Sequence, residues 1–268
     1  YNEKLYACDL NMLDMNAMGR FFPKTNKEDI ILNFKSQNNV SYNSHFVYPK
    51  GGAIEYINSL LHNIDSNKLC LNERLIHVDI NKKIAITNCR EIKYDRLIST
   101  IPFPLLLNMC EINYIHEYFS CNKVLVFNLG FDAKGNDQTN SWIYVPEKEY
   151  IFYRLGYYDN IMGTDKMSLY VEIGFSEKEE LQKEGLYLER ILRDLKKIGV
   201  ITSQKLVDYE AILMYPAYTH ITKRSVEEVN RIKKVLHKKN IYSIGRYGSW
   251  TYCSIEDNVL EAKKIAEE

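Results

Sequence analysis

Residues 241–262 read IYSIGRYGSWTYCSIEDNVLEA, and this stretch decides the fold class. Its first four residues, 241–244, are of the buried-strand type and lead into a turn that carries two glycines. A helix is expected after the turn, because Ser254 and Asp257 have the spacing of a capping box. A strand, a glycine-bearing turn and a helix N-terminus place backbone amides where an anion can bind. The stretch therefore predicts an α/β element at the end of the chain.

A second α/β pattern lies nearer the N-terminus, between about residues 51 and 102. Gly51 and Gly52 precede an amphipathic helix, in which the residues at helical spacing are Ile54, Ile57, Leu60, Leu61 and Ile64. Strand-like runs follow at residues 75–80, 84–87 and 94–100. The strand and helix at the end of the chain would complete this unit. Residues 51–102 and 238–268 are therefore predicted to form one domain.

The middle of the chain, about residues 103–237, has a different pattern. Strand-like runs with Gly, Asn and Asp turns between them occur at 123–131, 141–145, 150–155, 168–175 and 206–215. Amphipathic helices are predicted at about 177–198 and 226–236. This pattern predicts an α+β fold in which a lobe with a mixed sheet is inserted into an α/β domain. Residues 1–50 are predicted to be a connecting segment.

Composition narrows the classes of function. The 268 residues include 35 Lys+Arg and 35 Asp+Glu, so the formal net charge is zero. A nucleic-acid binder that works by counterion release needs a basic excess, so no nucleic-acid partner is expected. No apolar run approaches the roughly 20 residues of a membrane span. The six cysteines show no CxxC spacing, which favours free thiols in a reducing cytosol over disulfides or a metal site.

The chain lacks the local motifs of the common catalytic sites. It contains no GxGxxG, no GxxxxGK[ST], no HExxH and no GxSxG. The six histidines are isolated from one another in the sequence, so no metal site is predicted. The residues alone leave the catalytic groups unidentified.

Several segments nevertheless occur in an order that is typical of one family. They are residues 1–6 (YNEKLY), 48–52 (YPKGG), 94–102 (YDRLISTIP), 142–147 (WIYVPE), 152–154 (FYR), 215–218 (YPAY) and 245–252 (GRYGSWTY). Together they resemble motifs of the FAD-dependent amine oxidase and protoporphyrinogen oxidase superfamily, and most of all those of UDP-galactopyranose mutase-like proteins. The first segment departs from the family pattern, because Tyr6 stands where the family has Trp.

The resemblance implies a partial FAD-binding domain, residues 51–102 and 238–268, with an inserted substrate-binding lobe, residues 103–237. The family's GxGxxG unit would lie before Tyr1, so this chain is expected to lack it, either through removal or because it is encoded separately. The intact protein would then bind FAD, whereas this chain alone is expected to be inactive and not to retain the cofactor. An edge left uncovered in the FAD-binding domain would favour self-association.

The resemblance also implies roles for single residues. The residues expected to contact FAD are Leu75, Thr100, Pro102, Gly245, Arg246, Gly248, Ile255 and Glu256. The residues expected to line the substrate pocket, where relatives hold a nucleotide diphosphate, are Arg154, Tyr215, Tyr218 and Tyr252. An arginine suits phosphate oxygens because its guanidinium is a planar fork, and a tyrosine adds a ring and a hydroxyl. Structural alternatives stay open: the glycines can serve only the turn, Arg154 can be a surface residue, and the tyrosines can be core aromatics.

The implied function is that of a cytoplasmic bacterial flavoenzyme acting on a nucleotide sugar in surface-polysaccharide (LPS) biosynthesis. In the mutase mechanism the flavin is the nucleophile, which agrees with the lack of a conspicuous side-chain nucleophile. One alternative is an amine-oxidase-type dehydrogenase of a small molecule. Another is a non-catalytic lobe that binds a nucleotide sugar.

Overall fold

The computed structural model describes residues 1–21, 27–35 and 46–268. Part of the predicted connecting segment, residues 22–26 and 36–45, lies outside the described residues. The chain divides into two compact units, one made of residues 1–14 and 73–268 and the other of residues 15–72.

The smaller unit, residues 15–72, holds short helices. They are η2 (Gly19–Phe21), α2 (Lys27–Lys35), α3 (Ile54–Leu61) and η3 (Ser66–Lys68). Helix α3 is the amphipathic helix that the sequence predicts after Gly51 and Gly52, and Gly52 has a φ of 93°, which favours glycine before the helix.

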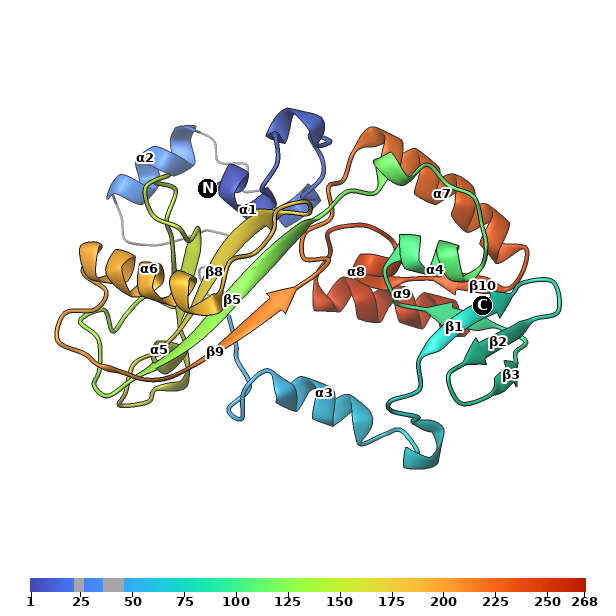
Figure 1. Cartoon of the computed structure of the whole chain (residues 1–268), viewed down its shortest axis with the longest axis horizontal. Coiled ribbons are helices and arrows are strands. Elements are labelled where there is room, and N and C mark those ends of the chain that lie inside the picture. Colours follow the sequence, from blue (N-terminus) through green and yellow to red (C-terminus); the bar gives the residue numbers. More distant parts are fainter. Residues whose placement is uncertain (22–26, 36–45) are drawn as a thin grey trace. The chain divides into compact units, whose positions relative to one another are not determined.

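The larger unit contains a five-stranded sheet (Figure 1). In spatial order its strands are β6 (Trp142–Tyr144), β7 (Arg154–Tyr157), β8 (Ser168–Ser176), β5 (Asn122–Phe131) and β9 (Leu206–Met214). Every neighbouring pair is antiparallel, so the prediction of a mixed sheet in this lobe is wrong. The connections from β6 to β7 and from β7 to β8 are too short for the crossover that parallel neighbours need.

One face of this sheet forms a hydrophobic core with α6 (Glu184–Lys197), which lies along the sheet in Figure 1. Alternate residues of β5, such as Phe127 and Leu129, point into this core and are almost fully buried. Helix α6 contributes Ile191 and Leu195. The opposite face of the sheet is therefore left for the more polar alternate residues.

The α/β part of the larger unit is built on a parallel pair of strands. Strand β4 (Leu97–Ser99) pairs with β10 (Ile241–Ser243), with Leu97 opposite Ile241 and Ser99 opposite Ser243. The prediction that the C-terminal strand returns beside the strand at residues 94–100 is confirmed. The domain boundaries at residues 51, 102 and 238 stay a prediction.

Four helices accompany the parallel pair (Figure 1). They are α4 (Phe103–Met109), α7 (Lys223–His237), α8 (Gly245–Gly248) and α9 (Ile255–Glu267). A second hydrophobic core joins α4 and α7 to β10, and its fully buried members include Phe103, Ile232 and Leu236. The capping box that the sequence predicts at the start of α9 is present, with Ser254 and Asp257 bonded to each other's backbone amides.

The remaining elements of the larger unit are short. An antiparallel sheet consists of β1 (Leu75–Asp79), β2 (Ile84–Thr87) and β3 (Glu91–Lys93). The others are α1 (Asn2–Tyr6), η1 (Leu10–Met12), η4 (His116–Tyr118) and α5 (Tyr158–Met162). The predicted α+β class, with an α/β portion and an inserted sheet lobe, agrees with this arrangement.

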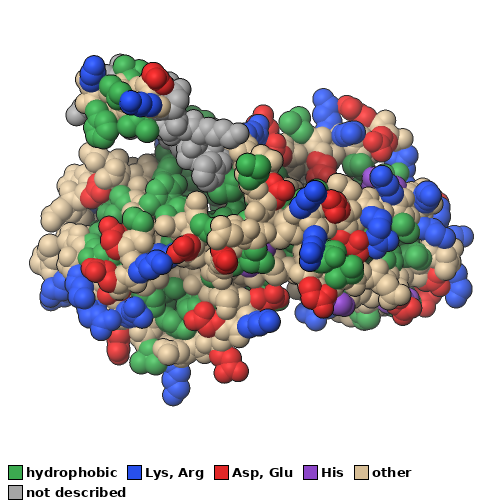
Figure 2. Space-filling model, turned by 90° about the horizontal axis from the view of Figure 1, so that it is seen from above, with side chains coloured by type: hydrophobic (Ala, Val, Ile, Leu, Met, Phe, Trp, Pro, Cys, Tyr) green, Lys and Arg blue, Asp and Glu red, His purple; other side chains and the backbone are tan. Residues whose placement is uncertain are grey.

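The surface is mixed in charge, as the equal numbers of basic and acidic residues predict. Lys and Arg side chains are interspersed with Asp and Glu side chains over the face shown in Figure 2. Among the described residues, no helix is long and apolar enough to cross a bilayer. In the same residues, no group of three or more His, Cys, Asp or Glu side chains could hold a metal ion.

Candidate active site

The polar face of the five-stranded sheet carries an ion pair at the start of β7. Arg154 stands opposite Glu172 of β8, and its Nη2 lies 2.6 Å and 2.8 Å from the two carboxylate oxygens. The hydroxyl of Tyr153 donates to the same carboxylate at 2.5 Å. Only 11% of the Glu172 side chain is exposed. The three side chains thus form one largely buried network.

The network fixes the charge of its members. Burial, the largest single effect, lowers the pKa of Arg154, but the charge and hydrogen bond of Glu172 act with Tyr218 and Tyr170 in the other direction, and the net pKa is raised. Burial, followed by the nearby Glu172 charge, raises the pKa of Tyr153. Arg154 is therefore a cation and Tyr153 a neutral hydroxyl donor at neutral pH.

A second guanidinium, that of Arg246 in α8, is surrounded by aromatic rings. Its Cζ lies 5.1 Å from the ring centre of Tyr218, 5.9 Å from that of Tyr247 and 4.6 Å from that of Tyr252. The rings of Tyr218 and Tyr252 are stacked, with their centres 6.2 Å apart. Ring faces attract a cation but leave its hydrogen-bond donors unsatisfied. Arg246 is thus a cation whose donors these three rings do not satisfy.

Both arginines line the same cavity. It has a volume of about 130 Å³, and its wall also includes Tyr153, Glu172, Tyr218, Tyr247, Val124, Met214 and Ala217. Within the described part of the chain, the buried Nε atoms of Arg154 and Arg246 have no hydrogen-bond partner. The buried hydroxyl of Tyr6, whose ring packs on that of Tyr218, has none either. Unsatisfied buried donors are costly, so a cavity lined by the two arginines that carry them is suited to an anion or ordered water.

The residues predicted to line a substrate pocket separate into two groups. Arg154 and Tyr218 line this cavity, and Tyr252 stacks beside it. Tyr215 does not line the cavity; it is exposed, and its hydroxyl donates to Glu177 at 2.5 Å. Arg246, which the resemblance assigned to the cofactor, lies in the wall of the cavity.

The residues predicted to contact FAD gather in part at one edge of the parallel pair. Thr100 follows β4, and Gly245 comes shortly after β10. The amide of Ile244 donates to the carbonyl of Ser99 at 2.9 Å, so the two residues lie at the same edge of the parallel pair. Parallel α/β sheets bind their ligands at this carboxyl edge. Pro102 caps the N-terminus of α4 just beyond it. The position of these residues fits one half of a dinucleotide site.

The glycines of the turn have structural reasons of their own. A Cβ at Gly248 would lie 3.1 Å from the Ser99 carbonyl oxygen and from Ser243 Oγ, so a larger residue there would crowd the contact between α8 and the strands. Gly245 has a φ of 79°, in the left-handed region. A cofactor contact of either residue stays a prediction.

Two backbone amides of this turn are already bonded to α9. The amide of Gly245 donates to Glu261 Oε2 at 2.7 Å, and the amide of Arg246 donates to Asn258 Oδ1 at 3.1 Å. A phosphate could reach these amides only after the α9 side chains had moved. The first two residues of α9, Ile255 and Glu256, are exposed at its N-terminus.

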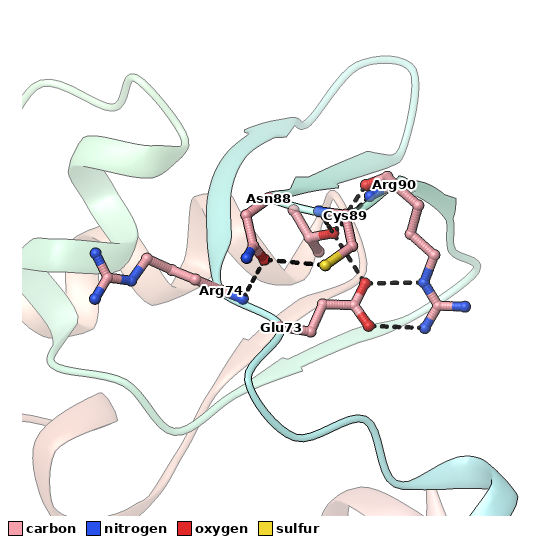
Figure 3. A network of polar contacts seen from close by, with 6 residues as sticks. Glu73, Arg74, Asn88, Cys89 and Arg90 are labelled. Carbon is pink, nitrogen blue, oxygen red and sulfur yellow. Dashed lines mark hydrogen bonds and ion pairs between the residues drawn. The ribbon is translucent and has the colours of Figure 1, made fainter.

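Leu75, expected to contact FAD, is the first residue of β1. The residue before it, Arg74, belongs to the polar network shown in Figure 3. Glu73 accepts two hydrogen bonds from Arg90, at 2.8 Å and 3.0 Å, and one from Thr87 Oγ1 at 2.9 Å. The amide of Arg74 donates to Asn88 Oδ1 at 2.7 Å. The network ties the start of β1 to the turn between β2 and β3, so it holds Leu75 in place.

Two residues of the site, Glu172 and Tyr153, are not among those predicted from the sequence. Glu172 is a single charge in the apolar run LYVEIGF of β8, which is a signal that a carboxylate is buried for a reason. Tyr153 precedes Arg154 in the segment FYR but has no feature of its own in the sequence. Its role depends on a contact with Glu172 of β8, the next strand along the chain.

Comparisons with known proteins agree on the family. The family model described as flavin containing amine oxidoreductase matches residues 10–268. A solved structure of reduced UDP-galactopyranose mutase is similar with a TM-score of 0.83 and 22% identity, over 94% of this chain and 58% of that chain. A protein assigned as a protoporphyrinogen oxidase from Exiguobacterium sp. 255-15 is similar with a TM-score of 0.66 and 14% identity, over 82% and 52%. No curated protein matches the sequence.

These likenesses concern the fold, because both identities are below 25%. The chain spans little more than half the length of the two solved structures. The predicted resemblance to amine oxidases, protoporphyrinogen oxidases and UDP-galactopyranose mutase-like proteins is confirmed.

Proposed function

The chain belongs to the flavin-containing amine oxidoreductase family, and on that premise we propose that its two-arginine cavity binds the diphosphate of a nucleotide sugar. The observation that carries the proposal is that Arg154 and Arg246 line one cavity and each has a buried Nε without a partner among the described residues. A diphosphate carries the negative charges and the acceptor oxygens that two guanidinium groups recognise.

The two arginines have different tasks in this proposal. The charge of Arg154 is balanced by Glu172, so this residue mainly offers directed donors in a fixed orientation. The guanidinium of Arg246 lies against aromatic ring faces, which do not neutralise its charge, so this residue adds attraction for an anion. The stacked Tyr218 and Tyr252 hold the Arg246 guanidinium in place.

The chemistry of the intact protein would depend on a flavin. When bound, this group would supply the redox or nucleophilic reactivity. The residues of this chain would bind the substrate, orient it and exclude water. Burial raises the pKa of Tyr218, so its hydroxyl stays protonated near neutral pH and can donate to a ligand. The hydroxyl of Tyr153 already donates to Glu172 and instead helps to orient that carboxylate.

A second candidate follows from the family itself, which is described as an oxidoreductase family. In this reading the intact protein oxidises a small molecule such as an amine. Reduction of the flavin by an amine, without any affinity for UDP, would favour it.

The LPS pathway, the bacterial source, the cytoplasmic location and self-association stay predictions. So does the third reading, a non-catalytic lobe that binds a nucleotide sugar.

Calorimetric titration of the protein that carries this chain with UDP tests the proposal. The variant Arg246→Ala is expected to weaken binding by about 1.5–3 kcal/mol, the range for hydrogen bonds to a charged group. Arg154→Ala is expected to weaken it by a similar amount. The matched control is Arg193→Ala in α6, whose side chain is 63% exposed on the opposite side of the sheet. Equal dissociation constants for all three variants and the unaltered protein would refute the proposal.

A further inference from the structure

The face of the five-stranded sheet that carries the ion pair extends beyond the residues that line the cavity. Residues directly opposite each other in antiparallel strands share a face. Arg154 is opposite Glu172, Glu172 is opposite Val126, and Val126 is opposite Ile212 of β9. Ile212 is 44% exposed. The row that starts at the ion pair thus ends in an apolar side chain that is exposed to solvent.

The next row on that face is polar. Tyr170 of β8 is opposite Asn128 of β5, which is opposite Glu210 of β9. Asn128 Nδ2 donates to Glu210 Oε2 at 3.3 Å, and the Tyr158 hydroxyl donates to Asn128 Oδ1 at 3.4 Å. The row therefore ends in an exposed carboxylate whose orientation is set by a neighbouring amide.

Tyr170 connects the polar row to the ion pair. Its ring lies across Gly156 of β7, where a Cβ would meet the ring at 2.1 Å. The Cζ of Arg154 lies 6.0 Å from the centre of the same ring. Glycine at position 156 thus leaves room for the Tyr170 ring beside Arg154.

From this arrangement we infer a second subsite, in which Glu210 and Asn128 bind the vicinal diol of a sugar ring attached to the diphosphate. The inference rests on the proposed function, because the diphosphate would be held by Arg154 and Arg246. A carboxylate accepts hydrogen bonds from two adjacent hydroxyls, and an exposed apolar residue such as Ile212 can pack against the face of the ring.

The spacing suits such a ligand. Met214 lines the cavity and Glu210 lies four residues earlier on the same face of β9. At about 3.4 Å per residue, the two are roughly 14 Å apart. A diphosphate joined to one sugar ring can extend over this distance. The diol could belong either to the ribose of the nucleotide or to the second sugar.

The test is calorimetric titration of the protein that carries this chain with four probes: inorganic pyrophosphate, UDP, dideoxy-UDP without the ribose diol, and UDP-galactose. Glu210→Gln is expected to weaken the binding of a diol-bearing probe by about tenfold or more. The same variant should bind pyrophosphate as the unaltered protein does, which also shows that it is folded. The matched control is Glu189→Gln, an exposed carboxylate of α6 on the other side of the sheet.

The outcomes separate the two sources of the diol. A loss seen with UDP but not with dideoxy-UDP assigns the subsite to the ribose. A loss seen only with UDP-galactose assigns it to the second sugar. Unchanged affinity of Glu210→Gln for every probe overturns this inference alone. No binding of any probe to the unaltered protein overturns the proposed function and this inference with it.

Discussion

Arg154 and Glu172 face each other across β7 and β8, and a single guanidinium nitrogen reaches both carboxylate oxygens, at 2.6 Å and 2.8 Å. The pair is mostly shielded from water, with 25% of the arginine and 11% of the glutamate side chain exposed. Because Glu172 also accepts from Tyr153, the orientation of Arg154 in the cavity depends on a carboxylate that lies beneath it. The ion pair therefore links the stability of the sheet to the geometry of the site.

Replacement of Glu172 is expected to destabilise the fold. In Glu172→Ala a buried guanidinium loses its partner, which should lower the free energy of unfolding by about 3 kcal/mol. The matched variant Tyr153→Phe removes one hydroxyl and should lower it by about 1 kcal/mol. Urea denaturation measures both values. A loss for Glu172→Ala no larger than that for Tyr153→Phe would show that the ion pair adds no stability.

The turn after β10 is expected to tolerate only glycine at position 248. In Gly248→Ala the new Cβ would press on the Ser99 carbonyl oxygen at 3.1 Å, and we expect a loss of about 1–3 kcal/mol. Gly185→Ala in α6 is the control, because a Cβ there meets nothing within 4 Å. That change should stabilise the helix by about 0.5–1 kcal/mol. Thermal denaturation of the two variants should give shifts of opposite sign, and a stabilising Gly248→Ala would contradict the prediction.

His220 is expected to make the fold sensitive to mild acid. Its Nε2 lies 2.9 Å from the Tyr6 carbonyl oxygen and so donates to it, while Nδ1, 3.0 Å from Ser120 Oγ, accepts from that hydroxyl. Both ring nitrogens are thus satisfied by the neutral form. Burial lowers the pKa of His220, and the Tyr6 carbonyl only partly opposes this effect.

The direction of the pH dependence follows from this lowered pKa. Below about pH 6.5 the unfolded chain takes up a proton at position 220 before the folded chain does. The stability that neutral His220 contributes is present above that pH and is lost as the pH falls through the folded-state pKa. In urea denaturation between pH 7.5 and pH 5, roughly the range of histidine titration, His220→Gln should show a weaker loss of stability with falling pH. His62→Gln, at an exposed position, should retain the full loss. Parallel curves for His220→Gln and the unaltered chain would contradict the prediction.

The chain by itself is expected not to retain FAD. It contains no GxGxxG, and the amides of Gly245 and Arg246 already bond to Glu261 and Asn258. Each missing charge-assisted contact to a pyrophosphate costs roughly 1.5–3 kcal/mol, so several of them lower the affinity by orders of magnitude. The purified chain should lack the visible absorption band of flavin. A yellow preparation would show that the edge formed by β4 and β10 binds the cofactor unaided.

The periodic elements could be predicted from the sequence because their signals are local. The apolar spacing in α3, the capping box at Ser254 and the strand–turn–helix at the end of the chain depend on residues within a few positions of one another. Helix α6 shows the limit of such signals. The sequence predicts it from about residue 177, but it begins at Glu184. Just before the helix, the amide of Gln182 donates to the Tyr187 hydroxyl, a contact that the apolar spacing does not indicate.

The sequence by itself also determined the family, through motifs whose order survives at low identity, and it singled out Arg154, Tyr218, Tyr252 and Arg246 as residues of interest. Only the tertiary structure decided how these residues combine. It brought Arg246 into the cavity of Arg154, directed Tyr215 to Glu177 instead, and supplied Glu172 as the partner of the arginine. The reason is physical: the side chains around a buried charge come from different strands and helices, and the strand register that brings them together is set by the packing of the whole sheet.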